Sequence, residues 1–225
     1  KIFVPRTEAE IWQELDKFIG MASVKAEIRS IVDDIKETKR SKGNDVQVEI
    51  RDHFVFTGNP GTGKTTMARC FADILNALGV LPKGHLVEVG SKDLIGDVIG
   101  ASERNVREAV DKSMGGILFI DEAYGLNDGT SYGQGAIDTL LKLVEDNRGK
   151  FICILAGYSK GMGDFMRQNS GLESRFNKVI DFPDYNAREL EAIFRITLKS
   201  KGFTLDSEAE ENIARHFDMV HLKRG

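Results

Sequence analysis

Hydrophobic positions recur at two spacings along the chain, and their pattern predicts helices at both ends with strands in the middle. Apolar residues three to four positions apart predict a helix that Thr7 caps and a second helix from Ala22 to about residue 42. After the last predicted strand, the same spacing predicts helices over residues 186–199 and 207–217, with no strand between them.

Between these ends, short apolar runs alternate with amphipathic segments. The apolar runs predict strands over residues 53–57, 86–89, 116–121, 151–156 and 178–182. The segments between them predict helices over residues 65–79, 102–112 and 134–147. This alternation is typical of an α/β fold, a parallel sheet flanked by helices on both sides. We therefore expect residues 1–185 to form an α/β domain and residues 186–225 to begin a small helical subdomain.

Composition and net charge exclude some classes of partner but do not identify the function. The 225 residues hold 31 Lys and Arg against 35 Asp and Glu, a net charge of −4, and 41% of them are hydrophobic. This balance is typical of a globular protein, and its acidity argues against nucleic acid as the partner. No apolar run approaches the ~18 residues of a membrane-spanning helix, so no membrane contact is expected.

Cysteine usage and the start of the chain add two further expectations. Cys70 and Cys153 lie far apart in apolar runs and give neither a disulfide framework nor a metal spacing. They predict a reduced, cytoplasmic protein. The chain begins with lysine and has no signal-peptide core, so we expect it to be part of a longer protein.

The strongest chemical signal is a segment that fits G-x-x-x-x-G-K followed by S or T: Gly58-Asn59-Pro60-Gly61-Thr62-Gly63-Lys64-Thr65. Glycines let successive N–H groups face a phosphate, and the helix that follows adds its positive end. Lys64 is predicted to contact the β- and γ-phosphates, Thr65 to ligate Mg²⁺, and Thr66 to join the nucleotide contacts. The strand–turn–helix context argues against a glycine-rich turn without a ligand. ATP or ADP with Mg²⁺ is the expected cofactor.

Two adjacent acids, Asp121 and Glu122, end a buried apolar strand. Asp121 is predicted to hold the Mg²⁺ shell beside Thr65, and Glu122 to orient the water that attacks ATP. Taken alone, the pair fits a solvated acidic turn equally well. After a phosphate loop, an acid next to the metal-binding Asp indicates hydrolysis, because a small-molecule kinase does not need a base that activates water there.

Together these motifs resemble the AAA+ ATPase module and, more narrowly, its CbbX/CfxQ subfamily of red-type Rubisco activases and stage V sporulation protein K-like ATPases. The resemblance runs from about Leu15 to Phe217. Besides the phosphate loop and Gly20, it depends on Asp121-Glu122-Ala123-Tyr124, Ala156-Gly157-Tyr158, Gly171-Leu172-Glu173-Ser174-Arg175 and Asp181-Phe182-Pro183-Asp184-Tyr185. It implies a P-loop NTPase fold with sheet order 5-1-4-3-2, a truncated helical lid, and a homo-oligomeric ring, usually a hexamer, with ATP between subunits.

The resemblance also assigns residues. Ile19 and Gly20 match the family's adenine pocket, although a helix break with a core contact explains them too. Arg175 matches the arginine finger that reaches the neighbouring subunit's γ-phosphate, which would make it catalytic beside Lys64 and Glu122. Alternatively, Arg175 is a plain surface arginine without a catalytic role. Arg167 is the weaker candidate for the arginine finger.

Three features of the family are not clearly matched in this sequence. The polar sensor after the fourth strand is Tyr158 or Ser159. Val98 occupies the position where the activases carry a pore-loop tyrosine, so peptide threading is less secure than ATP hydrolysis. The chain also stops before the second sensor arginine is expected, which predicts poor hydrolysis by this segment alone.

These observations predict a Mg²⁺-dependent ATPase that remodels or unfolds a protein partner as a ring. The sequence does not identify that partner. The alternatives are a nucleotide-gated scaffold with little turnover and a motor directed at nucleic acid. A small-molecule phosphotransferase is disfavoured by Glu122 and Arg175.

Overall fold

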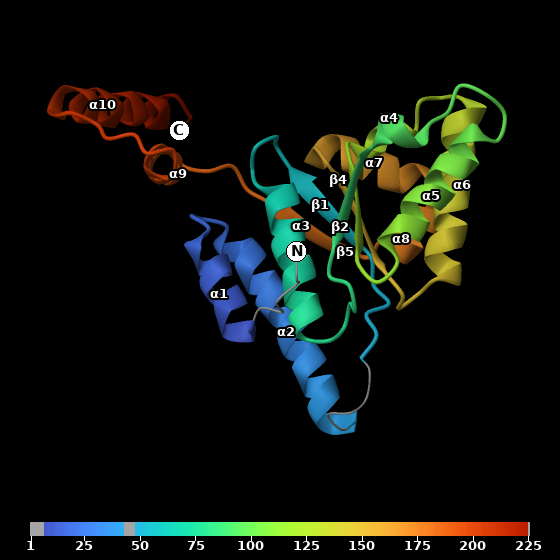
Figure 1. The fold of residues 1–225 in the computed structure, drawn as a ribbon. Helices are drawn as coiled ribbons and strands as arrows, with labels where there is room; N and C mark the ends of the chain where they lie inside the picture. Colours follow the sequence, from blue (N-terminus) through green and yellow to red (C-terminus); the bar gives the residue numbers. More distant parts are fainter. Residues whose placement is uncertain (1–6, 43–47, 225) are drawn as a thin grey trace.

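A computed structural model describes residues 7–42 and 48–224 of the protein, and its centre is a parallel sheet (Figure 1). Within these residues the sheet has five strands in the order β2-β3-β4-β1-β5, and each neighbouring pair is parallel. The strands are β1 (Phe54–Gly58), β2 (Leu86–Gly90), β3 (Ile117–Asp121), β4 (Ile152–Gly157) and β5 (Lys178–Phe182). The expected order 5-1-4-3-2 is confirmed.

Helices cover both faces of this sheet, so the molecule has three layers (Figure 1). One face packs against α1 (Glu8–Lys17), α2 (Ala22–Lys42) and α3 (Lys64–Ala77). The other packs against α5 (Ala101–Ser113), α6 (Ser131–Asp146), α7 (Ser159–Gln168) and α8 (Ser170–Arg175). Because side chains alternate along a strand, Phe54 and Phe56 join the first core and Val55 joins the second. The strand β3 is buried on both sides, which explains its unbroken apolar run.

The predicted start of the first helix is confirmed by its capping geometry. The Glu10 N–H donates to Thr7 Oγ1 at 3.3 Å, and the Thr7 N–H donates to Glu10 Oε2 at 2.7 Å. This reciprocal pair satisfies backbone donors that lack partners inside the helix.

Four short elements were not predicted. They are α4 (Ser91–Leu94), the 3₁₀ turn η1 (Ala123–Leu126), α7 and α8. The helix α7 contains Gly161 and Gly163, which lower helix propensity. Burial of Met162 and Phe165 stabilises it nonetheless. Gly161 is also the place where Tyr124 packs, since a Cβ there would lie 3.0 Å from the Tyr124 ring.

Two helices follow the sheet and lie apart from its layers (Figure 1): α9 (Ala187–Ser200) and α10 (Ser207–Arg224). They contact each other through the Phe194 and Phe217 rings, 6.0 Å apart, and through an ion pair between Arg195 and Glu210. The predicted division at residues 185 and 186 falls in the segment between β5 and α9 and stays a prediction. None of the described helices is long and apolar enough to cross a membrane.

Candidate nucleotide-binding site

A cavity of about 310 Å³ lies at the carboxyl ends of β1, β3 and β4. Functional sites of parallel α/β sheets form at this edge. The structure brings together here the phosphate loop, the carboxylate pair and the end of β4. The lining residues are Gly58, Pro60, Gly61, Gly63, Lys64, Thr65, Thr66, Asp121, Glu122, Gly157 and Tyr158.

The phosphate loop has the backbone geometry that its glycines were expected to allow. Gly61 and Gly63 adopt φ of 77° and 89°, and α3 begins directly after them at Lys64. The Lys64 ammonium donates to the carbonyl oxygens of Gly58 at 2.8 Å and Asn59 at 2.9 Å. Burial lowers the pKa of Lys64 and the nearby Asp121 carboxylate opposes that shift. The ammonium is therefore held over the loop, where phosphate oxygens would replace its carbonyl partners.

The segment after β5 supports this loop from behind. The Asn59 amide donates to both carboxylate oxygens of Asp184 at 2.9 Å, and the Tyr185 hydroxyl donates to the Thr62 carbonyl at 3.3 Å. Gly63 has φ 89°, and a Cβ there would lie 2.4 Å from the Met21 methyl, so a side chain at this position would be strained and would displace Met21. Thr62 is buried and its hydroxyl donates to the Asn59 carbonyl at 2.8 Å. Asn59 and Thr62, both predicted to contact nucleotide, thus have side chains bonded within the protein. Asp184 and Tyr185 belong to a family signature in the sequence, but their contacts with the loop were not predicted, because a contact across 123 residues leaves no local pattern.

Asp121 and Glu122 both line the cavity, as predicted. The Glu122 N–H donates to Asp121 Oδ1 at 3.0 Å, and Glu122 has φ 49° and ψ 42°. This left-handed conformation is uncommon for a residue with a side chain and is often found at functional sites. Burial raises the pKa of Tyr124, and the neighbouring Glu122 carboxylate adds to that shift.

Thr65 and Asp121 offer oxygen ligands of the kind that a magnesium ion requires. A hydroxyl and a carboxylate are oxygen ligands of the type that Mg²⁺ prefers, and both line one cavity. Mg²⁺ is commonly bound by one or two protein groups together with substrate phosphates and water. The residues present therefore fit this ion.

The structure separates the two candidates for the polar sensor. Tyr158 lines the cavity with 40% of its surface exposed, and its ring lies 6.1 Å from that of Tyr124. The Ser159 hydroxyl instead donates to Asp181 Oδ1 at 3.4 Å, an oxygen that also accepts from the Thr57 hydroxyl at 2.6 Å. Of the two, Tyr158 lines the cavity and Ser159 does not.

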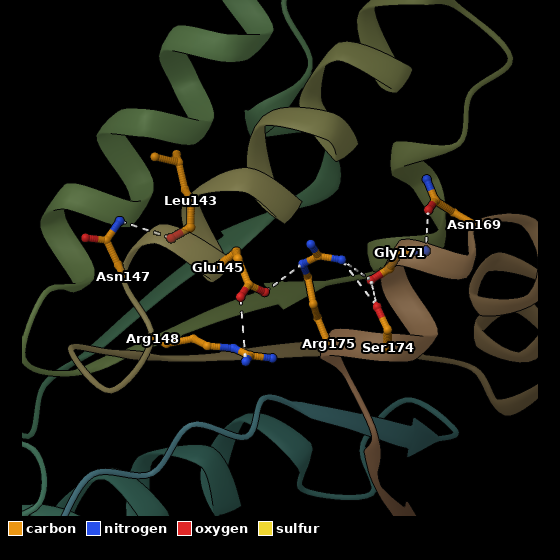
Figure 2. A network of polar contacts seen from close by, with 8 residues as sticks. All are labelled: Leu143, Glu145, Asn147, Arg148, Asn169, Gly171, Ser174 and Arg175. Atoms are coloured by element: carbon orange, nitrogen blue, oxygen red, sulfur yellow. Dashed lines mark hydrogen bonds and ion pairs between the residues drawn. The ribbon is translucent and has the colours of Figure 1, made fainter.

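Besides Asn59 and Thr62, the predicted site residues Ile19, Gly20 and Arg175 do not line this cavity, and neither does Val98 of the predicted pore loop. Ile19 and Gly20 are half-buried between α1 and α2, and a Cβ on Gly20 would lie 2.6 Å from Glu189 Oε1 at the start of α9. Arg175 lies at the end of α8, beside Glu145 (Figure 2). Val98, from the predicted pore loop, is 61% exposed between α4 and α5.

The chain is similar to known proteins in sequence. The model of the ATPase family associated with various cellular activities (AAA) matches residues 54–184. Stage V sporulation protein K of Bacillus subtilis (strain 168) is 43% identical over 204 residues, covering 89% of this chain and 63% of that protein. The chloroplastic ribulose bisphosphate carboxylase/oxygenase activase of Cyanidioschyzon merolae (strain NIES-3377 / 10D) is 39% identical over 226 aligned positions, covering 95% of this chain and 76% of that protein.

The chain is also similar to solved structures in fold. The AAA domain of FIGL-1 in complex with ADP matches with a TM-score of 0.62 and 19% identity, covering 90% of this chain and 65% of that chain. At this identity the likeness shows the fold alone. The chain spans 63% of the length of the sporulation protein, so it corresponds to a part of that relative.

Proposed function

The chain belongs to the AAA family of ATPases, and on that premise we propose that it is a Mg²⁺-dependent ATPase that remodels or unfolds a protein partner as a ring. One observation carries this proposal: Lys64, Thr65, Asp121 and Glu122 line a single cavity. These are the groups needed to bind a polyphosphate, hold its metal ion and orient a water molecule.

The proposed chemistry divides between binding and hydrolysis. The loop N–H groups and the Lys64 ammonium bind the phosphates of ATP. Bound through Thr65 and Asp121, Mg²⁺ supplies positive charge to the phosphate oxygens. Glu122 accepts a hydrogen bond from the attacking water and orients it toward the γ-phosphate, and Tyr158 is the proposed polar sensor. Ile19 and Gly20 are proposed to contact adenine, which would place the base near the start of α9.

Arg175 is proposed to act on the ATP of a neighbouring subunit. It does not line the cavity of its own chain, and its side chain is 27% exposed. An arginine that reaches a phosphate in trans stabilises the charge that develops in the transition state. This role requires an assembly, and the proposed assembly is a homo-oligomeric ring, a hexamer by family.

A protein is the proposed partner. The activase among the relatives has a name that gives another enzyme as its target. Val98 and Ile99, 61% and 93% exposed, offer the proposed ring an apolar loop for contact with polypeptide. Cys70 and Cys153 are both buried, and the proposed location is the cytoplasm, where thiols stay reduced.

The test is a comparison of Glu122→Gln with the unchanged full-length protein. The variant keeps the shape of the side chain but loses the charge that orients water, so ATP turnover should collapse while ATP stays bound. Turnover that survives within a few-fold would contradict the proposed role of Glu122. A protein captured by the ATP-bound variant would support remodelling, whereas stimulation of turnover by DNA would favour a motor on nucleic acid.

Slow turnover of the full-length protein, with or without captured partners, would favour the nucleotide-gated scaffold.

The matched control for Glu122→Gln is Glu108→Gln, a similarly conservative change on the exposed side of α5. It should leave turnover and binding unchanged.

A further inference from the structure

Arg175 lies against an acidic depression, separate from the nucleotide cavity. The residues that line this depression are Asp138, Leu141, Lys142, Glu145, Asp146 and Arg175. Its carboxylates come from the middle and the last turn of α6, and Arg175 comes from the last turn of α8. Figure 2 shows the Glu145 and Arg175 side chains pointing toward each other across the gap between the two helices.

The guanidinium of Arg175 has contacts on two sides. Its Nε lies 3.3 Å from Glu145 Oε2, an ion pair without the alignment of a hydrogen bond. Its Nη1 donates to the Gly171 carbonyl and to the Ser174 hydroxyl, each at 3.3 Å. These contacts restrain a side chain that would otherwise lose considerable rotamer entropy on reaching a phosphate.

Glu145 and Arg175, which form this ion pair, both lie near helix ends that side-chain hydrogen bonds fix. The Asn147 amide donates to the Leu143 carbonyl at 3.0 Å at the end of α6, and Asn169 Oδ1 accepts from the Gly171 N–H at 2.9 Å at the start of α8 (Figure 2). Glu145 Oε1 also lies 3.6 Å from Arg148 Nη1. Glu145 therefore also faces a second arginine, which lies just beyond the end of α6.

A structural ion pair does not explain this arrangement well. Pairs between partly exposed side chains add little to stability; the side chains of Arg175 and Glu145 are 27% and 43% exposed, although the Nε atom itself is buried. The two helices are already joined by apolar packing, because Leu172 of α8 and Leu141 of α6 belong to the same buried core. The contact has more effect on the direction of the guanidinium than on the fold.

We infer that Glu145 is a positioning residue for Arg175. It orients the guanidinium through Nε, so that the arginine is already in place when a neighbouring subunit presents its γ-phosphate. Arg148 partly neutralises the Glu145 carboxylate, which limits its competition with phosphate for Arg175. This inference rests on the proposed function of Arg175 in trans.

The test is a double-mutant cycle on the full-length, assembled protein, with kcat and KM for ATP measured for Glu145→Ala, Arg175→Ala and the double variant. Glu145→Ala should lower kcat about tenfold, since a misplaced catalytic group loses rate, and should leave KM within about twofold. Glu145→Gln keeps an acceptor oxygen and should lose less. In the Arg175→Ala background the Glu145 change should have no further effect. Asp146→Ala, which removes the next carboxylate of the same depression, is the matched control and should change neither constant.

Each other outcome contradicts the inference in its own way. An unchanged kcat in Glu145→Ala, with the expected loss in Arg175→Ala, overturns the positioning role alone. A raised kcat shows that Glu145 restrains Arg175 instead of positioning it. A loss that persists in the Arg175→Ala background shows that Glu145 acts by another route. Normal turnover in Arg175→Ala removes the proposed function of Arg175 and the inference together. If Glu145→Ala does not fold, the near-isosteric Glu145→Gln carries the same cycle.

Discussion

At the scale of single residues, two charged residues of the candidate site have environments that differ from those of ordinary surface residues. Lys64 is partly buried over two loop carbonyls, and Glu122 adopts a left-handed backbone beside Asp121. Burying an ammonium and holding a non-glycine residue in a left-handed backbone both cost free energy. Such features are typical of sites where charged groups are directed at a ligand.

The first prediction concerns Lys64. Replacing Lys64 with Ala removes a charge-assisted contact to phosphate worth about 1.5–3 kcal/mol, so ATP affinity should fall at least about tenfold. Titration calorimetry on the variant measures this directly. Lys92→Ala, which removes an exposed lysine of α4, is the control and should bind as the unchanged protein does. Equal affinities for ATP in Lys64→Ala and Lys92→Ala would contradict the phosphate-loop assignment.

The second prediction concerns His53, which is fully buried between the rings of Phe151 and Phe176. Its Nδ1 accepts from the Cys153 N–H at 3.0 Å, and burial lowers its pKa to about 4. The imidazole is thus neutral in the fold, whereas the unfolded chain takes up the proton below about pH 6.5. Between pH 6.5 and pH 4 the unfolded state binds more protons, so the free energy of unfolding falls as the pH drops.

From pH 7 to pH 5 the His53 contribution should cost about 2 kcal/mol of unfolding free energy. His53→Asn keeps an acceptor near the Cys153 N–H but does not titrate, so its stability should depend less on pH by that amount. Urea unfolding of both proteins at pH 7 and pH 5 tests this. Parallel losses of stability in the two proteins would show that His53 is not the group responsible.

Residue identities were more predictable than residue contacts. The spacing of Gly58 to Thr65 and the acids at 121 and 122 predicted the cavity lining, because each motif is local in sequence. The support that Asp184 and Tyr185 give to the loop was not predicted, since it joins segments more than 120 residues apart. The choice between Tyr158 and Ser159 likewise needed the position of Asp181 in space.

At the scale of elements, all five strands were predicted. The central strands β1, β3 and β4 are buried apolar runs, which have few alternatives in a chain of this length. The edge strands β2 and β5 are more exposed and contain charged residues, and were predicted from shorter apolar stretches. The helices α7 and α8 were not predicted, because they are short and the first contains two glycines. Their stability comes from Phe165 and Leu172 in the core, which is a tertiary effect.

The third prediction belongs to the start of α9, which connects the sheet to the last two helices. Asn186 Oδ1 accepts from the Glu189 N–H at 3.0 Å, and Glu189 Oε2 accepts from the Asn186 N–H at 2.8 Å. Losing this cap costs about 1 kcal/mol, so the amides of the first turn of α9 should exchange hydrogen about fivefold faster in Asn186→Ala.

The control for this cap is Asn186→Ser, since serine also caps helices and should keep exchange near that of the unchanged protein. Hydrogen exchange read by mass spectrometry over residues 187–200 distinguishes the two variants. Equal exchange in both would mean that the contacts of Glu189 elsewhere, and not the cap, hold the start of this helix.

At the scale of the whole molecule, the fold explains why one chain holds only part of the proposed catalytic set. The phosphate loop and the carboxylates meet at the carboxyl edge of the sheet, whereas Arg175 lies at the end of α8 against α6. Sheet order and layers could be predicted from alternating elements and the family resemblance. The family resemblance predicted that Arg175 acts on a neighbouring subunit. The structure adds that Arg175 lies away from the cavity of its own chain, so the proposed function depends on assembly.

The most direct test of that account mixes two inactive variants of the full-length protein. Glu122→Gln subunits keep ATP bound and retain Arg175, whereas Arg175→Ala subunits retain Glu122 but lack the arginine. A shared ring places an intact Arg175 beside an intact Glu122 at some interfaces, so ATP turnover should rise well above that of either variant alone, with mixed assembly verified by mass. Turnover in verified mixed rings that stays at the level of the separate variants would contradict an ATPase site completed by Arg175 of a neighbouring subunit.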